Sequence, residues 1–129
     1  MIIAQISDTH IFLPSGNNEQ RISEKRIQNL KECVKGIKSL KTTPDVILHT
    51  GDVTHNGTIE EYKIVHNILG NLKIPIFYTP GNRDNRKNLY KIFNQKYILD
   101  LKSNFHIYLV ELSNLARQSL FTEADEKVL

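Results

Sequence analysis

The sequence predicts an α/β fold in which a β-α-β-α-β segment forms a partial parallel sheet with flanking helices. Short apolar runs alternate with longer amphipathic stretches, and each of the first three runs ends in a polar loop. The chain has 129 residues, of which 40% are hydrophobic and 24% are charged, so it can bury the core of one domain. Right-handed crossovers are expected to connect the parallel strands.

The first strand is expected at residues 2–7, where the letters IIAQIS form an apolar run. A helix over about 22–41 and a second strand at 45–50 (DVILHT) follow. The helix is indicated by apolar residues at helical spacing, namely Ile27, Leu30, Cys33, Val34, Ile37 and Leu40. Because Cys33 belongs to this stripe, we expect it to be a buried core residue rather than a reactive thiol.

A second helix is expected to begin with a capping box. Thr58 is placed as the N-cap and Glu61 as the third helical residue, and the helix ends near Gly70. A third strand at 74–79 (IPIFYT) precedes a short helix over about 86–94. These elements complete the β-α-β-α-β order.

Two later apolar runs, 97–101 (YILDL) and 105–112 (FHIYLVEL), predict a hairpin or two adjacent strands. We expect residues 1–112 to form the domain and residues 113–129 to form an atypical C-terminal tail. His106 alternates with apolar neighbours and has no motif around it, so we do not expect it to bind a metal.

Composition excludes several classes of protein. The 17 basic and 14 acidic residues give a net charge of +3, an excess too small and dispersed to indicate nucleic-acid binding. The single cysteine excludes an internal disulfide and a cysteine-based zinc cluster. No apolar run approaches the 18 residues of a membrane span, and the short N-terminal run has no basic flank. We therefore expect a cytoplasmic protein without a membrane partner.

Polar residues collect where the first three expected strands end. These clusters are 7–10 (SDTH), 50–57 (TGDVTHNG) and 79–85 (TPGNRDN). Ligands of open α/β sheets bind outside the carboxyl ends of the strands, so the three clusters are expected to meet. Gly51 and Gly81 would allow tight turns there.

The candidate metal ligands in these clusters are Asp8, His10, Asp52 and Asn82. In a regular strand Asp8 and His10 would share one face, because they are two residues apart. Asp52 could bridge two ions, and Asn82 would bind through its carbonyl oxygen. Such a mixture of oxygen and imidazole ligands suits a divalent ion such as Mn, Fe, Zn or Mg.

The ordered blocks DTH (8–10), GDVTHNG (51–57) and PGNRD (80–84) resemble those of the calcineurin-like metallophosphoesterases. That family carries D-x-H, G-D-x-x and G-N-H-D/E in the same order, then an isolated His and a G-H-x-H. The resemblance covers about residues 1–110. It is strongest to the branch that includes bacterial cyclic-nucleotide phosphodiesterases and glycerophosphodiesterases.

The resemblance implies a role for each candidate ligand. Asp8 and His10 would bind the first metal ion, Asp52 would bridge two ions, and Asn82 would bind the second. The pair of ions would hold and activate a hydroxide that attacks the phosphorus of a small phosphoester.

Two departures from the family pattern bear on activity. Arg83 replaces the family histidine, and a guanidinium can clamp phosphate oxygens but cannot donate a proton at neutral pH. His55 is the other candidate for protonating the leaving group, and its alternative role is a solvated loop histidine. The sequence also has no G-H-x-H, so three family ligands and the second half of the usual two-sheet sandwich are missing.

Two functions remain open on this basis. The first is a truncated phosphodiesterase, weakly active or inactive alone, for which a 3',5'-cyclic nucleotide is the best single substrate. The second is a non-catalytic remnant that binds a metal, a phosphate or a protein partner. An uncovered sheet face and edge would favour self-association or a complementing C-terminal half. A nucleotide-binding domain is disfavoured, because neither glycine-rich phosphate motif occurs.

Overall fold

The structure is a computed structural model that describes residues 1–94, 98–100 and 106–108. Its centre is a three-stranded parallel sheet in the order β1-β2-β3, with β1 at Ile3–Ile6, β2 at Val46–His49 and β3 at Ile76–Tyr78. The register pairs Ile3 with Val46 and Leu48 with Phe77. The predicted β-α-β-α-β order is confirmed, although each strand is shorter than its apolar run.

Helix α1 spans Asn17–Lys38, so it begins and ends earlier than the expected 22–41. Its first turn is polar and therefore invisible to apolar periodicity. The Glu19 carboxylate stabilises this turn by accepting hydrogen bonds from the backbone N–H of Ser15 at 2.9 Å and from its hydroxyl at 3.1 Å. At the other end Leu40, counted in the apolar stripe, is exposed and lies outside the helix.

Helix α2 spans Ile59–Leu69 and has the predicted capping box. Thr58 Oγ1 accepts from the backbone N–H of Glu61 at 3.3 Å, and the Glu61 carboxylate accepts from the N–H of Thr58 at 3.2 Å. A 3-10 turn, η1 (Gly70–Leu72), follows the helix. Reciprocal caps of this kind satisfy two backbone donors that the helix itself cannot.

Helix α3 spans Arg86–Phe93 and is capped by the side chain of Asn85. Beyond it, β4 (Ile98–Asp100) and β5 (His106–Tyr108) pair antiparallel, as the hairpin prediction required. The expected domain boundary after residue 112 and the tail at 113–129 lie outside the described residues.

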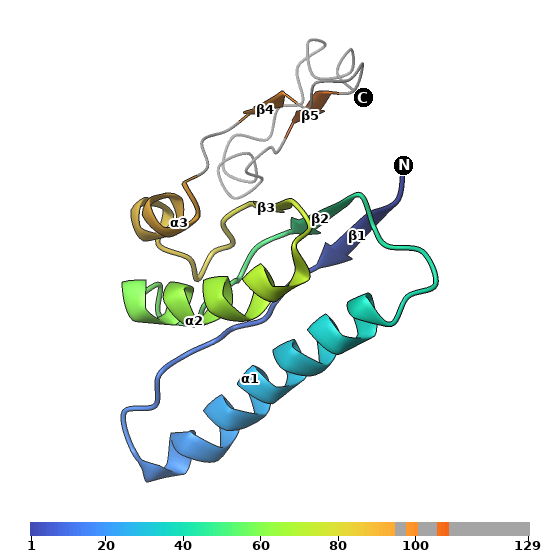
Figure 1. The fold of residues 1–129 in the computed structure, drawn as a ribbon. Helices are drawn as coiled ribbons and strands as arrows, with labels where there is room; N and C mark the ends of the chain where they lie inside the picture. The colour runs from blue at the N-terminus through green and yellow to red at the C-terminus, as the bar shows by residue number, and fades with distance from the viewer. Residues whose placement is uncertain (95–97, 101–105, 109–129) are drawn as a thin grey trace.

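Helices α1 and α2 lie on the same face of the sheet (Figure 1). This follows from the strand order, because successive right-handed crossovers between neighbouring strands place their helices on one side. The buried core between them includes Leu30 and Val34 of α1, Val65 and Leu69 of α2, and Ile47 of β2.

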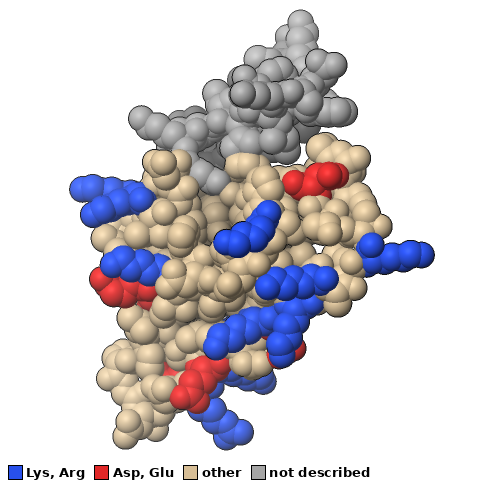
Figure 2. All heavy atoms as spheres, viewed as in Figure 1, with Lys and Arg blue, Asp and Glu red and all other residues tan. Residues whose placement is uncertain are grey.

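Cys33 is only half-buried, whereas the sequence predicted a buried core position. Partial burial nevertheless raises the pKa of its thiol, which keeps the thiol protonated at neutral pH. On the face shown in Figure 2, Lys and Arg side chains are spread over the surface with a few acidic side chains among them. None of the helices in the described ranges is long and apolar enough to cross a membrane.

Candidate metal centre

The loops that follow β1 and β2 run side by side past the end of the sheet. The backbone N–H of Asp8 donates to the carbonyl of Gly51 at 3.0 Å, and that of His10 donates to the carbonyl of Asp52 at 2.9 Å. These bonds extend the parallel pairing of the two strands into their loops. They bring the first two polar clusters of the sequence together.

Asp8, His10 and Asp52 each offer a ligand atom, and these atoms lie within 4.8 Å of one another. His10 Nε2 is 3.5 Å from Asp8 Oδ1 and 3.6 Å from Asp52 Oδ2. Two carboxylates and one imidazole at this separation fit a divalent cation, since these are the usual oxygen and nitrogen ligands of such ions.

The backbone that presents these side chains is a loop. β1 ends at Ile6, so Asp8 and His10 follow the strand, as expected from an apolar run that stops at residue 7, and they do not share the face of a regular strand. Asp8, His10 and Asp52 have φ values of 55°, 43° and 49°, in the left-handed region. Residues other than glycine adopt this region at a cost, and such residues cluster at functional sites.

Asn82 lies against the Asp52 carboxylate. When its amide NH₂ faces Asp52, the nitrogen donates to Oδ2 at 3.0 Å and to Oδ1 at 3.2 Å. The opposite rotation directs its carbonyl oxygen toward the same carboxylate, an arrangement that a cation between the oxygens would stabilise. The third polar cluster thus reaches the second, which is bonded to the first.

Gly81 is required for this approach. A Cβ atom on Gly81 would collide with Oδ1 and the backbone nitrogen of Asp52. Gly51 has a φ of +105°, which side-chain-bearing residues rarely adopt. The two glycines therefore allow the loops after β2 and β3 to come together.

Asp84 is buried beneath these loops and was not singled out from the sequence. Its carboxylate accepts hydrogen bonds from the backbone N–H groups of Val53 (3.0 Å), Thr54 (3.1 Å) and Gly81 (2.9 Å). It also accepts from the hydroxyl of Tyr62 at 2.9 Å. Asp84 therefore joins α2 to both ligand-bearing loops. Its place at the end of PGNRD was the one feature of the sequence that could have indicated this role.

Glu61 makes a second buried connection. Beyond its capping role, its carboxylate accepts from the backbone N–H of Leu13 at 3.1 Å. It also accepts from the backbone N–H and side-chain amide of Asn56, at 3.2 Å and 2.8 Å. Only the cap could be identified from the sequence, because the other donors are distant along the chain or in an irregular loop.

His49, the last residue of β2, is fully buried beneath the centre. Thr9 Oγ1 donates its one proton to the carbonyl of Val53 at 2.7 Å. In its 3.0 Å contact with His49 Nε2 the hydroxyl oxygen is therefore the acceptor, and Nε2 carries the hydrogen. Burial lowers the pKa of His49 to about 4, which keeps the imidazole neutral at physiological pH.

The two residues considered for substrate chemistry both lie next to candidate ligands. Arg83 is exposed, and its backbone N–H donates to Asp52 Oδ1 at 3.0 Å. The ring centroids of His55 and His10 are 6.0 Å apart. The Nδ1 atom of His55 is buried and has no hydrogen-bond partner among the described residues.

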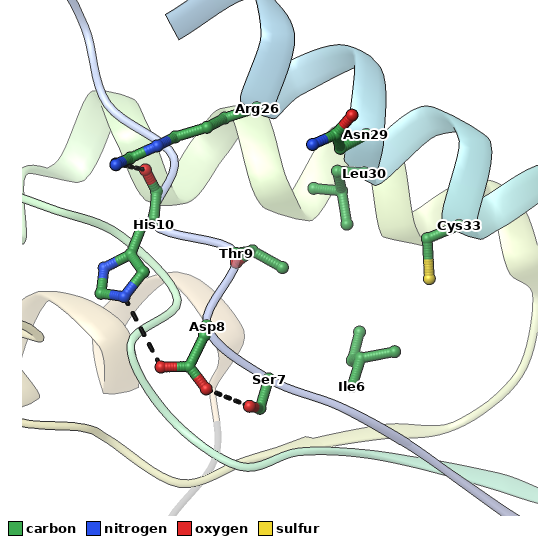
Figure 3. Close-up of a pocket in the computed structure, with 9 residues that line it drawn as sticks. All are labelled: Ile6, Ser7, Asp8, Thr9, His10, Arg26, Asn29, Leu30 and Cys33. Atoms are coloured by element: carbon green, nitrogen blue, oxygen red, sulfur yellow. Dashed lines mark hydrogen bonds and ion pairs between the residues drawn. The ribbon is translucent and has the colours of Figure 1, made fainter. Parts of the chain in front are cut away.

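A pocket of about 480 Å³ separates the loop after β1 from α1. Asp8 and His10 lie along one wall, and the side chains of Arg26 and Cys33 project from α1 on the other (Figure 3). Arg26 reaches across to the carbonyl oxygen of His10. The half-burial of Cys33 follows from its place in this pocket.

Comparison with known proteins gives consistent matches. The model of the calcineurin-like phosphoesterase family matches residues 1–126. A probable glycerophosphodiester phosphodiesterase of Arcobacter nitrofigilis is 37% identical over 98 residues, which cover 74% of this chain and 34% of that protein. A probable cyclic nucleotide phosphodiesterase of Vesicomyosocius okutanii is 32% identical over 131 residues, covering 98% of this chain and 52% of that protein.

A 3',5'-cyclic-nucleotide phosphodiesterase of Nostoc is 33% identical over 92 residues, covering 71% of this chain and 34% of that protein. The chain thus spans about a third to a half of the length of these curated relatives. The family model covers nearly all of the chain, and the loops after its first three strands converge as described. The chain belongs to the calcineurin-like phosphoesterase family.

Proposed function

We propose that the chain supplies the N-terminal part of a metal-dependent phosphoesterase that hydrolyses phosphodiesters, 3',5'-cyclic nucleotides being the best single candidate. The observation that carries this proposal is the convergence of Asp8, His10 and Asp52 within 4.8 Å at the carboxyl ends of the strands. The names of the relatives support the phosphodiester substrate class.

In this proposal Asp8 and His10 hold one divalent ion, Asp52 contacts two, and Asn82 contributes its carbonyl oxygen to the second. Bound divalent ions would lower the pKa of a water molecule and neutralise charge on the phosphoryl group. Mn, Fe, Zn and Mg all accept ligands of these types.

Arg83 and His55 have different chemistry to offer a phosphoester. The exposed guanidinium of Arg83 can pair with phosphate oxygens, but it keeps its protons at neutral pH. His55 lies beside His10, so its imidazole is the candidate for delivering a proton to the leaving group.

A second candidate function is a module that binds metal and phosphate without turnover. It is supported by the three candidate ligands alone, because Asp8, His10 and Asp52 lie close enough together to hold a cation. Self-association or a complementing C-terminal half would then complete the centre.

The test combines calorimetric titration with Mn²⁺ and hydrolysis of bis(p-nitrophenyl) phosphate and cyclic AMP. We expect weak Mn²⁺ binding that falls at least about 10-fold in Asp52→Asn, because a ligating charge is lost. Asp45→Asn is the matched control, since Asp45 is exposed and lies just before β2, at the opposite end of the strand from the centre.

We expect slow, Mn²⁺-dependent hydrolysis by the chain alone. Metal binding without any turnover of either ester would favour the non-catalytic module. Equal Mn²⁺ affinity in the wild type and Asp52→Asn would contradict both functions, because each requires this carboxylate.

A further inference from the structure

Two side chains of α1, one helical turn apart, bond to the backbone of the loop that follows β1. The hydroxyl of Ser23 donates to the carbonyl of Phe12 at 2.6 Å, and Nη1 of Arg26 donates to the carbonyl of His10 at 2.8 Å. Residues three apart share a helix face, so both bonds arise from one side of α1. The helix therefore contacts the candidate metal-binding loop directly.

The Arg26 guanidinium is held by a second contact. Its central carbon lies 5.1 Å from the centre of the Phe12 ring, in a cation–π arrangement. Phe12 is itself buried and bonded to Ser23 through its carbonyl. Arg26 is half-buried, and the contact with Phe12 restricts the orientation of the guanidinium that bonds to His10.

The peptide groups on both sides of the His10 Cα atom are thereby fixed. Its N–H donates to the carbonyl of Asp52, and its carbonyl accepts from Arg26. The intervening φ of 43° is unfavourable for a residue with a side chain, so it needs such external support. This backbone conformation directs the imidazole toward Asp8 and Asp52.

We propose that Arg26 is a positioning residue that holds His10 in its ligand orientation and so sets the affinity of the centre for a divalent cation. The inference rests on the proposed function in one respect, that His10 binds the cation. The bond to the His10 carbonyl is made by Nη1, and the proposal assigns no step of the chemistry to Arg26.

The experiment compares Arg26→Ala and Arg26→Lys with Arg21→Ala, a control that removes an exposed arginine from the same helix. Co²⁺ is the probe, because its visible spectrum reports ligand geometry and its affinity can be titrated. We expect Arg26→Ala to weaken Co²⁺ binding about 10-fold and to change the spectrum. Arg26→Lys, which retains a charged donor nitrogen, should recover part of the affinity, and Arg21→Ala should match the wild type.

A metal-free measurement separates this inference from the proposed function. In the NMR spectrum of the apoprotein, Arg26→Ala should shift the imidazole signals of His10 and leave those of His66, on α2, unchanged. These shifts would support the positioning role even if the wild type bound no Co²⁺. The absence of Co²⁺ binding by the wild type would refute the proposed function instead.

Unchanged His10 signals in a folded Arg26→Ala variant would overturn the inference, as would wild-type Co²⁺ affinity with an unaltered spectrum. If Arg26→Ala does not fold, Arg26→Lys decides by the same signals. An Arg26→Ala variant that loses affinity for inorganic phosphate alone, with Co²⁺ binding intact, would assign Arg26 to anion binding and also overturn the inference.

Discussion

Asp84→Asn tests whether one buried carboxylate holds the candidate centre together. The substitution preserves the shape of the side chain but replaces one accepting oxygen with an NH₂ group. Oδ2 accepts from the N–H groups of Val53 and Gly81, and Oδ1 accepts from the N–H of Thr54 and the hydroxyl of Tyr62. Either amide orientation therefore places a donor against two donors.

The expected loss follows from these contacts. Each buried donor left without an acceptor costs about 1–3 kcal/mol, and the surviving bonds lose the extra strength of a charged acceptor. With two donors unsatisfied, the free energy of unfolding should fall by about 3 kcal/mol, a large part of the roughly 5–15 kcal/mol typical of a domain. The ligand loops should also separate, so Mn²⁺ affinity should fall with stability.

Urea denaturation followed by far-ultraviolet circular dichroism measures the first effect, and calorimetric titration measures the second. Asp45→Asn is the matched control. The exposed carboxylate of Asp45 accepts a hydrogen bond of 2.6 Å from the backbone N–H of Ile2, and it lies away from the centre. A loss below about 1 kcal/mol in Asp84→Asn, no greater than that of the control, would refute the assigned role of Asp84.

Two further predictions concern Gly81 in the loop after β3 and His49 at the end of β2. Gly81→Ala should reduce Mn²⁺ affinity at least about 10-fold, because the new methyl group would displace Asp52; Gly36→Ala, at an open helical position, should instead stabilise the chain by about 1 kcal/mol. Equal titrations for the two variants would show that no close approach is needed at Gly81. Burial places the pKa of folded His49 at about 4, below its ordinary value of 6.5. The unfolded chain therefore binds the proton first, and stability falls as the pH drops from 6.5 to 4, by up to about 3 kcal/mol. Urea denaturation at pH 7.5 and 4.5 measures this loss of stability, and in His49→Gln the difference between the two pH values should be smaller. An unchanged pH dependence would contradict a buried neutral imidazole.

Local patterns were sufficient to predict the order of the elements and the candidate ligands. Apolar runs mark the three strands, of which β2 and β3 are largely buried, whereas β1 alternates between exposed and half-buried residues. The capping box at Thr58 was readable because both of its partners lie within one turn. The end of α1 was misplaced, because the exposed Leu40 continues the apolar spacing after the helix has stopped.

The tertiary structure decided how the ligands are presented. Asp8 and His10 lie in left-handed loop conformations, supported by backbone bonds to the loop after β2, and a strand pattern cannot reveal this. The guanidinium of Arg26 and the buried carboxylate of Asp84 are charged groups with hydrogen-bond partners 16 or more positions away along the chain, Gly81 being a nearer partner of Asp84. Sequence periodicity reports burial and secondary structure, whereas hydrogen bonds between distant segments depend on three-dimensional packing. The sequence by itself therefore determined which residues meet at the centre, and only the fold decided which groups hold them there.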